Sequence, residues 1–369
     1  MTRIASRNSE NGGPPVLARF LAGCTLVAVW SAGILFSQTS PAPNADRDAM
    51  YEHLKKAQQI AGLDLYPHFC RRCLIAETYP RTIAQSNQAF AAIEPLRVFD
   101  NLYFLGQNGV SSWALTTSGG IILFDGLDNP EEAKTFIVGG MAKVGLNPSD
   151  IKYIIITHGH GDHFGGVKYL KETYGAHVMC SKIDWALMAE TKARASRPPA
   201  DGRAAGRGAA SGRGGPPPEW GNLVPDHDLD IEDGQKLTLG DATVTFYITP
   251  PHTMGAVTTL FKVVDQGKPH VTAIYGSFSV PATAEAKDLH LKTLARWRGI
   301  AQAAGVDTLI ANHQTQDQSV ENLELLRVRR AGDPNPYVIG TGAYLRYIDV
   351  MAECTRYAAA RSGQKLTVK

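Results

Sequence analysis

Three histidines and one aspartate near the middle of the chain are the residues best suited to chemistry. His158, His160, Asp162 and His163 occupy six positions directly after an apolar segment. Imidazole and carboxylate groups are the ligands that zinc and similar divalent ions prefer. The alternative is a histidine-rich surface turn, but burying these groups without partners beside a core strand would be costly. The pattern therefore predicts a metal site.

The apolar segment before these residues predicts the element that positions them. Residues 151–157 (IKYIIIT) are mostly β-branched or aromatic, which is typical of a strand buried on both faces. We expect Gly159 and Gly161 to adopt backbone angles that other residues avoid, so that the later ligands turn back toward the first. We also expect Gly165 and Gly166 to let the next helix begin close to the site.

Two more predicted strands end in a histidine. Residues 243–249 (TVTFYIT) predict a strand, and His252 follows it after two prolines. Residues 306–311 predict a final strand, and Asn312 and His313 come directly after it. Strand, turn and histidine thus recur at three places that are far apart in the chain.

The motif His-x-His-x-Asp-His after an apolar strand resembles the signature of the metallo-β-lactamase superfamily. The resemblance extends from about residue 98 to about residue 330. It implies an α/β fold, a four-layer αββα sandwich, with one or two metal ions at the edge between two similar halves. It also implies two zinc ions. The first would be bound by His158, His160 and His252, and the second by Asp162, His163 and His313.

Within the superfamily, this ligand set is most similar to the class B, subclass 3 metallo-β-lactamases, in which no cysteine binds metal. Ser277 and Ser279 resemble serines that help to hold the substrate carboxylate there, although strand-end hydroxyls in a turn are the alternative. Asp125 resembles a carboxylate that braces the metal loop, with an ordinary Asp-Gly turn as the alternative. Phosphodiesterases and thioesterases of this superfamily usually have a glycine followed by an aspartate that bridges the two metals. In this chain Gly276 is followed by Ser277 instead.

The resemblance implies an enzyme that opens a β-lactam ring of a small-molecule substrate by attack of a metal-bound hydroxide, which Asp162 would also orient. This chain departs from the usual pattern around its later ligands. Pro251, Met254 and Ala256 replace a glycine, a proline and a serine, and Gln314 replaces a proline. A lactone or another cyclic ester or amide therefore remains an alternative substrate.

The N-terminal residues predict export. Arg3, Arg7 and Arg19 precede the uncharged residues 20–36 (FLAGCTLVAVWSAGILF), a layout typical of a secretory signal peptide. We therefore interpret residues 1–45 as a signal peptide and expect a periplasmic or secreted protein. An uncleaved membrane tether through residues 20–36, facing the periplasm, is the alternative.

The remaining chain divides into two predicted parts. Residues 46–95 form an N-terminal extension that packs on the domain, and residues 96–369 form the hydrolase domain. Residues 194–218 are rich in Gly, Ala, Arg and Pro and predict a flexible insertion. An RNA-binding or anion-attracting lid is the alternative, but the insertion has no aromatic residues for base stacking. The net charge of +2 does not favour nucleic acid as a partner, and the oligomeric state is left open.

Four cysteines follow the N-terminal segment: Cys70, Cys73, Cys180 and Cys354. In an exported protein they predict one or two structural disulfides, and the sequence does not choose the pairing. A redox pair or half of a zinc site at Cys70 and Cys73 is the alternative.

Overall fold

The computed structural model describes residues 40–75, 93–195 and 218–368, which belong to one compact unit. The predicted apolar tether at residues 20–36 and most of the predicted insertion at 194–218 lie outside the described residues. In the part of the chain that is described, no helix has both the length and the apolar character needed to cross a membrane.

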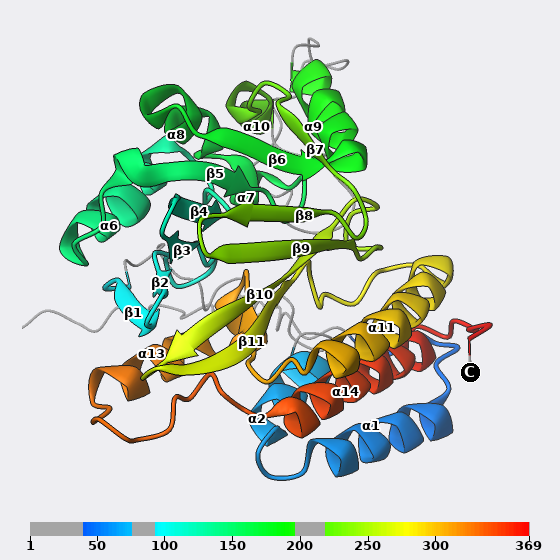
Figure 1. Cartoon of the computed structure of the whole chain (residues 1–369). Helices are drawn as coiled ribbons and strands as arrows, with labels where there is room; N and C mark the ends of the chain where they lie inside the picture. Colours follow the sequence, from blue (N-terminus) through cyan, green and yellow to red (C-terminus); the bar gives the residue numbers. More distant parts are fainter. Residues whose placement is uncertain (1–39, 76–92, 196–217, 369) are drawn as a thin grey trace, which may run out of the picture. The chain divides into compact units, whose positions relative to one another are not determined.

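Two β-sheets form the centre of this unit (Figure 1). The first sheet is antiparallel from its first to its fourth strand and parallel from there to its seventh. Its strands, in spatial order, are β1 (Leu96–Phe99), β2 (Leu102–Phe104), β3 (Trp113–Thr117), β4 (Gly120–Phe124), β5 (Ile151–Ile155), β6 (His177–Ser181) and β7 (Leu229–Ile231). The second sheet has the order β12 (Ile310–Ala311), β11 (Lys268–Tyr275), β10 (Val257–Asp265), β9 (Ala242–Ile248) and β8 (Lys236–Leu239).

Helices cover the outer face of each sheet, so the predicted four-layer αββα sandwich is confirmed (Figure 1). The first sheet is covered by α5 (Pro130–Glu132), η2 (Ala133–Val138), α6 (Gly139–Lys143), α8 (Val167–Tyr174) and α9 (Lys182–Ala195). The second is covered by α1 (Arg47–Ala61), α11 (Ala284–Ala304) and α14 (Thr341–Arg361). Shorter helical segments complete the unit: α2 (Tyr66–Phe69), η1 (Cys70–Ile75), η3 (Pro148–Asp150), α7 (Gly161–Phe164), α10 (Pro218–Leu223), α12 (Gln314–Asp317) and α13 (Ser319–Arg327).

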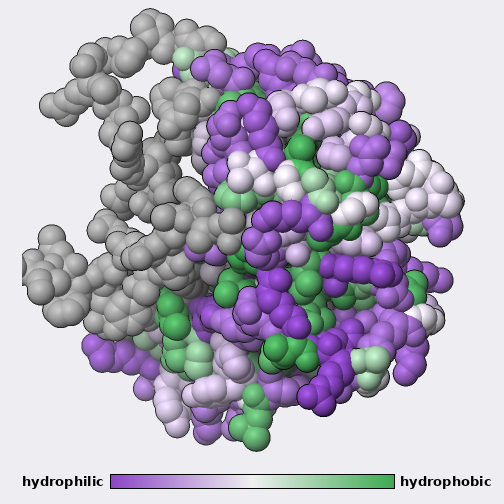
Figure 2. All heavy atoms as spheres, turned by 90° about the vertical axis from the view of Figure 1, so that its left-hand side faces the viewer, coloured by the Kyte–Doolittle hydropathy of each residue, from purple (hydrophilic) through white to green (hydrophobic). Residues whose placement is uncertain are grey.

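The alternation of side chains along the strands creates three separate cores. In β4, Ile121 and Leu123 pack toward the helices, whereas Ile122 and Phe124 pack between the two sheets. The third core lies between the second sheet and its helices and contains the fully buried Trp297. Because successive residues of a strand point to opposite faces, each strand stabilises two layers at once. On the face shown in Figure 2, apolar side chains appear mostly as small patches between hydrophilic ones.

The predicted strand at residues 306–311 is wrong over most of its length. Only Ile310 and Ala311 pair with β11. The preceding residues do not continue this pairing: the Asp307 N–H donates to the Val271 carbonyl of β11, the Leu309 N–H donates to the Tyr337 carbonyl, and Thr308 forms an isolated bridge with Val338. Apolar composition indicated a strand here, but Thr308 and Leu309 take their backbone partners from a segment nearly thirty residues further along the chain.

The segment before the first sheet is joined to the C-terminal helix. The Asp46 side chain accepts a hydrogen bond from the Ala49 N–H at the start of α1, and α1 packs against α14. A disulfide links Cys73 in η1 to Cys354 in α14, which resolves the cysteine pairing that the sequence left open. Cys180 is a buried free thiol, and Cys70 is a free, partly exposed one.

Candidate metal centre

The end of β5 is held in place by a carboxylate from the end of β4. The Thr157 N–H donates to Asp125 Oδ1 and the Thr157 hydroxyl donates to Asp125 Oδ2, both at 2.8 Å. Asp125 Oδ2 also lies 2.7 Å from Nδ1 of His163. One fully buried side chain therefore fixes the start of the histidine loop and orients one of its rings, leaving His163 Nε2 available as a ligand.

The glycines of the histidine loop matter because a side chain would be crowded at their positions, and not because their backbone angles are unusual. Neither Gly159 nor Gly161 has a positive φ, so that expectation was wrong. A Cβ atom on Gly161 would instead lie 2.1 Å from the Trp220 ring. A Cβ atom on Gly165 would lie 1.9 Å from the Asp128 carbonyl oxygen, and one on Gly166 would lie 2.4 Å from another carbonyl oxygen of the same loop, so the later pair lets the chain before α8 pack closely on the loop after β4.

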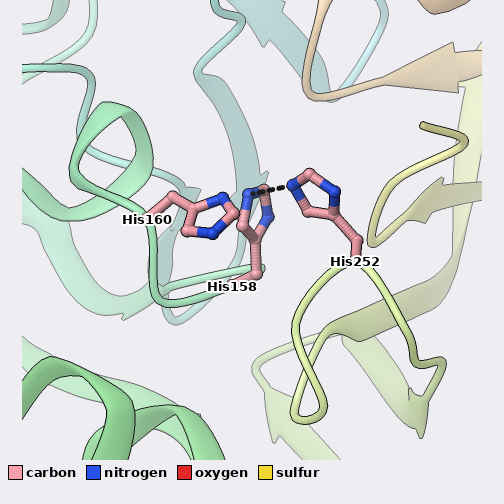
Figure 3. Close-up of side chains that lie close together, drawn as sticks. All are labelled: His158, His160 and His252. Atoms are coloured by element: carbon pink, nitrogen blue, oxygen red, sulfur yellow. Dashed lines mark hydrogen bonds between the residues drawn. The ribbon is translucent and has the colours of Figure 1, made fainter. Parts of the chain in front are cut away.

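Three histidines from two different sheets converge at one point (Figure 3). His158 and His160 come from the loop after β5, and His252 comes from the loop after β9. One ring nitrogen from each lies within 4.8 Å of the others, and the Nε2 atoms of His158 and His252 are 3.1 Å apart. Two imidazole nitrogens bound to one tetrahedral zinc ion at its usual bond lengths are about 3.3 Å apart. The spacing therefore fits a shared metal ion.

A second group lies directly beside the first. His163 Nε2 is 3.2 Å from His313 Nε2, and Asp162 Oδ2 is 3.4 Å and 3.6 Å from the same two nitrogens. His158 also lies within 4.8 Å of Asp162 and His163, so the two groups are contiguous. All six predicted ligands are thus brought together, although His252 and His313 are far from the others in sequence.

Burial and the local carboxylates set the charge of this cluster. Burial lowers the pKa of His158 and His252 well below the usual range and lowers the pKa of His313 to about 4, so these imidazoles are neutral, as metal ligands must be. Burial also acts to lower the pKa of His163, but the carboxylates of Asp162 and Asp125 outweigh it and raise that pKa to about 10. The same negative charge that favours a proton on His163 favours a divalent cation.

Asp184 is a residue of the site that the sequence did not reveal. Its Oδ2 accepts hydrogen bonds from the Gly159 N–H (2.8 Å) and the Thr253 hydroxyl (2.6 Å), and its Oδ1 accepts from the Gly255 N–H (3.1 Å). This buried carboxylate therefore joins the loop of His158 and His160 to the loop of His252. Burial raises its pKa, and these three hydrogen bonds act in the opposite direction.

The only local signal at Asp184 was that of a helix start. The Ser181 hydroxyl accepts a hydrogen bond from the Asp184 N–H, an arrangement typical of a helix N-terminus. That pattern predicts α9 but says nothing of two loops that approach from elsewhere in the chain.

Gln314 supports the loop that orients His313. Its side-chain Nε2 donates to the carbonyls of Gln107 and Val110. Within that loop, the Gly109 carbonyl lies 3.1 Å from His313 Nδ1, which directs the other ring nitrogen toward Asp162. Gln314 stands where a proline is usual, and His313 nevertheless keeps its place in the metal centre.

Asn312 ties the end of β12 to the ends of β5 and β11. Its Nδ2 donates to the Thr157 hydroxyl (3.0 Å) and to the Gly276 carbonyl (3.1 Å). The segment that begins at Gly276 contains both serines predicted to bind substrate. Ser277 is buried and its hydroxyl accepts a hydrogen bond from the Ser279 N–H, whereas Ser279 itself is partly exposed.

Comparisons with known proteins agree with this fold. Residues 105–262 match the family model of the metallo-β-lactamase superfamily. The fold is similar to that of BJP-1, a subclass B3 metallo-β-lactamase of Bradyrhizobium japonicum, with 24% identity, a TM-score of 0.54, and coverage of 74% of this chain and 93% of that one. It is also similar to native FEZ-1 metallo-β-lactamase from Legionella gormanii (22% identity, TM-score 0.55, 70% and 92% covered) and to a β-lactamase from Chitinophaga pinensis (24%, 0.54, 73% and 94%).

Proposed function

We propose that this chain, whose residues 105–262 match the family model of the metallo-β-lactamase superfamily, is an exported, zinc-dependent enzyme that opens a β-lactam ring. The domain family and the fold are those of a metal-dependent hydrolase. The observation that carries the proposal is the convergence of five imidazoles and one carboxylate at three strand ends.

Each residue of the centre has a proposed role. His158, His160 and His252 bind one zinc ion, and Asp162, His163 and His313 bind a second. When bound, the zinc ions supply a Lewis acid that activates water near neutral pH and polarises the substrate carbonyl. The Asp162 side chain keeps 26% of its surface exposed, so its carboxylate can bind a metal and also orient a nucleophile by a hydrogen bond. Ser277 and Ser279 hold the substrate carboxylate.

The substrate is tested with the zinc-loaded protein and nitrocefin, a chromogenic β-lactam. We expect hydrolysis that stops when a chelator is added. Turnover of lactones with no turnover of any β-lactam would contradict the proposed substrate and leave the metal centre in place. The lactone alternative is kept because Pro251, Met254 and Gln314 alter the surroundings of two ligands relative to the usual superfamily pattern.

The Asp184→Asn variant is expected to lower affinity for the first zinc ion by about 10- to 100-fold, as is usual when the partners of ligand loops are removed. An asparagine presents one oxygen and one N–H₂ group, so it cannot accept from Gly159, Thr253 and Gly255 together. Competition with a coloured chelator measures the affinity, and elemental analysis measures the zinc content.

Asp288→Asn is the matched control for Asp184→Asn. Asp288 also accepts from two backbone N–H groups and a hydroxyl, but these belong to Thr367 and Val368 at the C-terminal end. We expect that variant to lose stability without losing zinc affinity. Equal zinc affinities of the Asp184→Asn variant and the wild type would contradict the role assigned to Asp184.

Export is supported by two features of the chain. Arginines precede the uncharged residues 20–36, as in signal peptides. The Cys73–Cys354 disulfide fits an oxidising compartment, where such bonds persist. We therefore propose that the mature protein is in the periplasm or outside the cell, and a membrane tether through residues 20–36 is the alternative. We also propose that its partner is a small molecule and not nucleic acid.

A further inference from the structure

A hollow opens directly beside two of the proposed zinc ligands. It lies between α9 and the loop after β9, has a volume of about 740 Å³, and includes His160 and His252 in its wall. This volume falls within the range of about 300–1,000 Å³ that is typical of small-molecule pockets. A molecule bound at the first metal position therefore borders this space.

One wall of the hollow is an apolar face of α9 that does not pack into the core. Trp185 and Met188 point into the core between α9 and the first sheet. Ile183, Ala186 and Leu187 follow the spacing of a second helical face, and all three line the hollow. Lys182 and Glu190 also line the hollow, at the two ends of this apolar strip.

The opposite wall is formed by the loop that carries His252. Pro251 and Met254 contribute to it, and Met254 is 54% exposed. Ile183, on the facing helix, is 51% exposed. Exposed apolar side chains that line one hollow beside a reactive centre gain stability when an apolar group displaces water from it.

We propose that this hollow binds an apolar side group of the substrate, so that the enzyme prefers cyclic amides or esters carrying an alkyl or aryl substituent over the bare ring. This inference rests on the proposed metal centre and refines its substrate class. Ile183 and Met254 are the residues that determine the preference. The substituent extends past His160 and His252 and packs between α9 and the His252 loop.

The first test measures binding and does not depend on turnover. Acetohydroxamate and octanohydroxamate share a metal-binding group and differ only in the length of the alkyl chain. For the zinc-loaded wild type, calorimetry is expected to give at least about tenfold tighter binding of the longer compound. In the Ile183→Gln, Met254→Gln double variant, that ratio is expected to fall below about threefold, while acetohydroxamate binds as before.

A matched control changes exposed apolar residues that do not line the hollow. The Leu325→Gln, Val328→Gln variant alters two side chains that are 57% and 75% exposed, and it is expected to keep the wild-type ratio. An equal chain-length effect in the wild type and the Ile183→Gln, Met254→Gln variant would overturn the inference. Failure of both compounds to bind zinc-loaded protein would instead overturn the metal centre on which the inference rests.

Substrate pairs extend the test to the reaction. Benzylpenicillin is compared with 6-aminopenicillanic acid, and lactones with long acyl chains are compared with short ones. The pair used is the one that the wild-type enzyme hydrolyses. In the Ile183→Gln, Met254→Gln variant, KM is expected to rise about tenfold for the substrate with the larger side group, and its kcat is expected to stay unchanged. Both kcat and KM for the other substrate of the pair are expected to stay unchanged. Equal changes for both members would contradict a subsite for the side group.

Discussion

Removal of divalent metal with a chelator is expected to reduce hydrolysis at least about 10³-fold, because the proposed reaction takes its nucleophile and its Lewis acid from the metal. The cysteine thiol near the site, that of Cys180, is a poor nucleophile. Cys180 lies on β6, next to β5, and burial raises the pKa of its thiol well above the usual range. Elemental analysis is expected to find two zinc ions per chain before chelation and none afterwards.

Reconstitution separates loss of metal from loss of fold. Zinc added back to the chelated protein is expected to restore the rate, whereas magnesium is not, because imidazoles are poor ligands for that ion. Circular dichroism measured before and after chelation shows whether the fold is kept. Full activity in protein shown to be free of metal would refute the proposed chemistry.

The Asp162→Asn variant is expected to lower kcat by about 10²- to 10⁴-fold, the range typical of groups that orient or transfer a proton in the reaction. Asp162 is the carboxylate among the six proposed ligands, and its Oδ2 faces the Nε2 atoms of His163 and His313. The imidazoles of His163 and His313 oppose the effect of burial and hold the pKa of Asp162 well below its usual range, so the group is negatively charged. Asparagine removes that charge and weakens zinc binding at the second position.

Asp150→Asn gives the same change of charge at an exposed residue just before β5. It is expected to leave kcat, KM and zinc content unchanged. Measuring zinc content beside kcat distinguishes two effects of Asp162→Asn. A drop in kcat with both zinc ions retained indicates loss of nucleophile orientation, and a drop with one zinc ion lost indicates loss of a ligand. A kcat within twofold of wild type would remove Asp162 from the centre.

Much of the architecture could be predicted because it depends on local periodicity. The strands around residues 121–124 and 151–155 alternate between two cores, and their apolar character on both faces is visible in the sequence. Helix α1 spans Arg47–Ala61 between Asp46 and Gly62, and these two residues are of the types that commonly precede and follow a helix. The prediction was wrong at residues 306–309, because Thr308 and Leu309 pair with the distant residues 337–338 and composition alone does not identify that pairing.

The sequence by itself determined which side chains could bind metal, since six histidine and aspartate ligands after three apolar segments are a local pattern. Only the tertiary structure decided how they meet. The Asp184 carboxylate that joins two ligand loops, the Gln314 side chain behind His313, and the Cys73–Cys354 pairing all depend on contacts between distant segments. Glycines in the histidine loop looked like turn residues, yet Gly161 is required by the Trp220 ring packed against it. Such contacts have no local periodicity, because the partner of each side chain is set by the packing of layers and not by its neighbours in the chain.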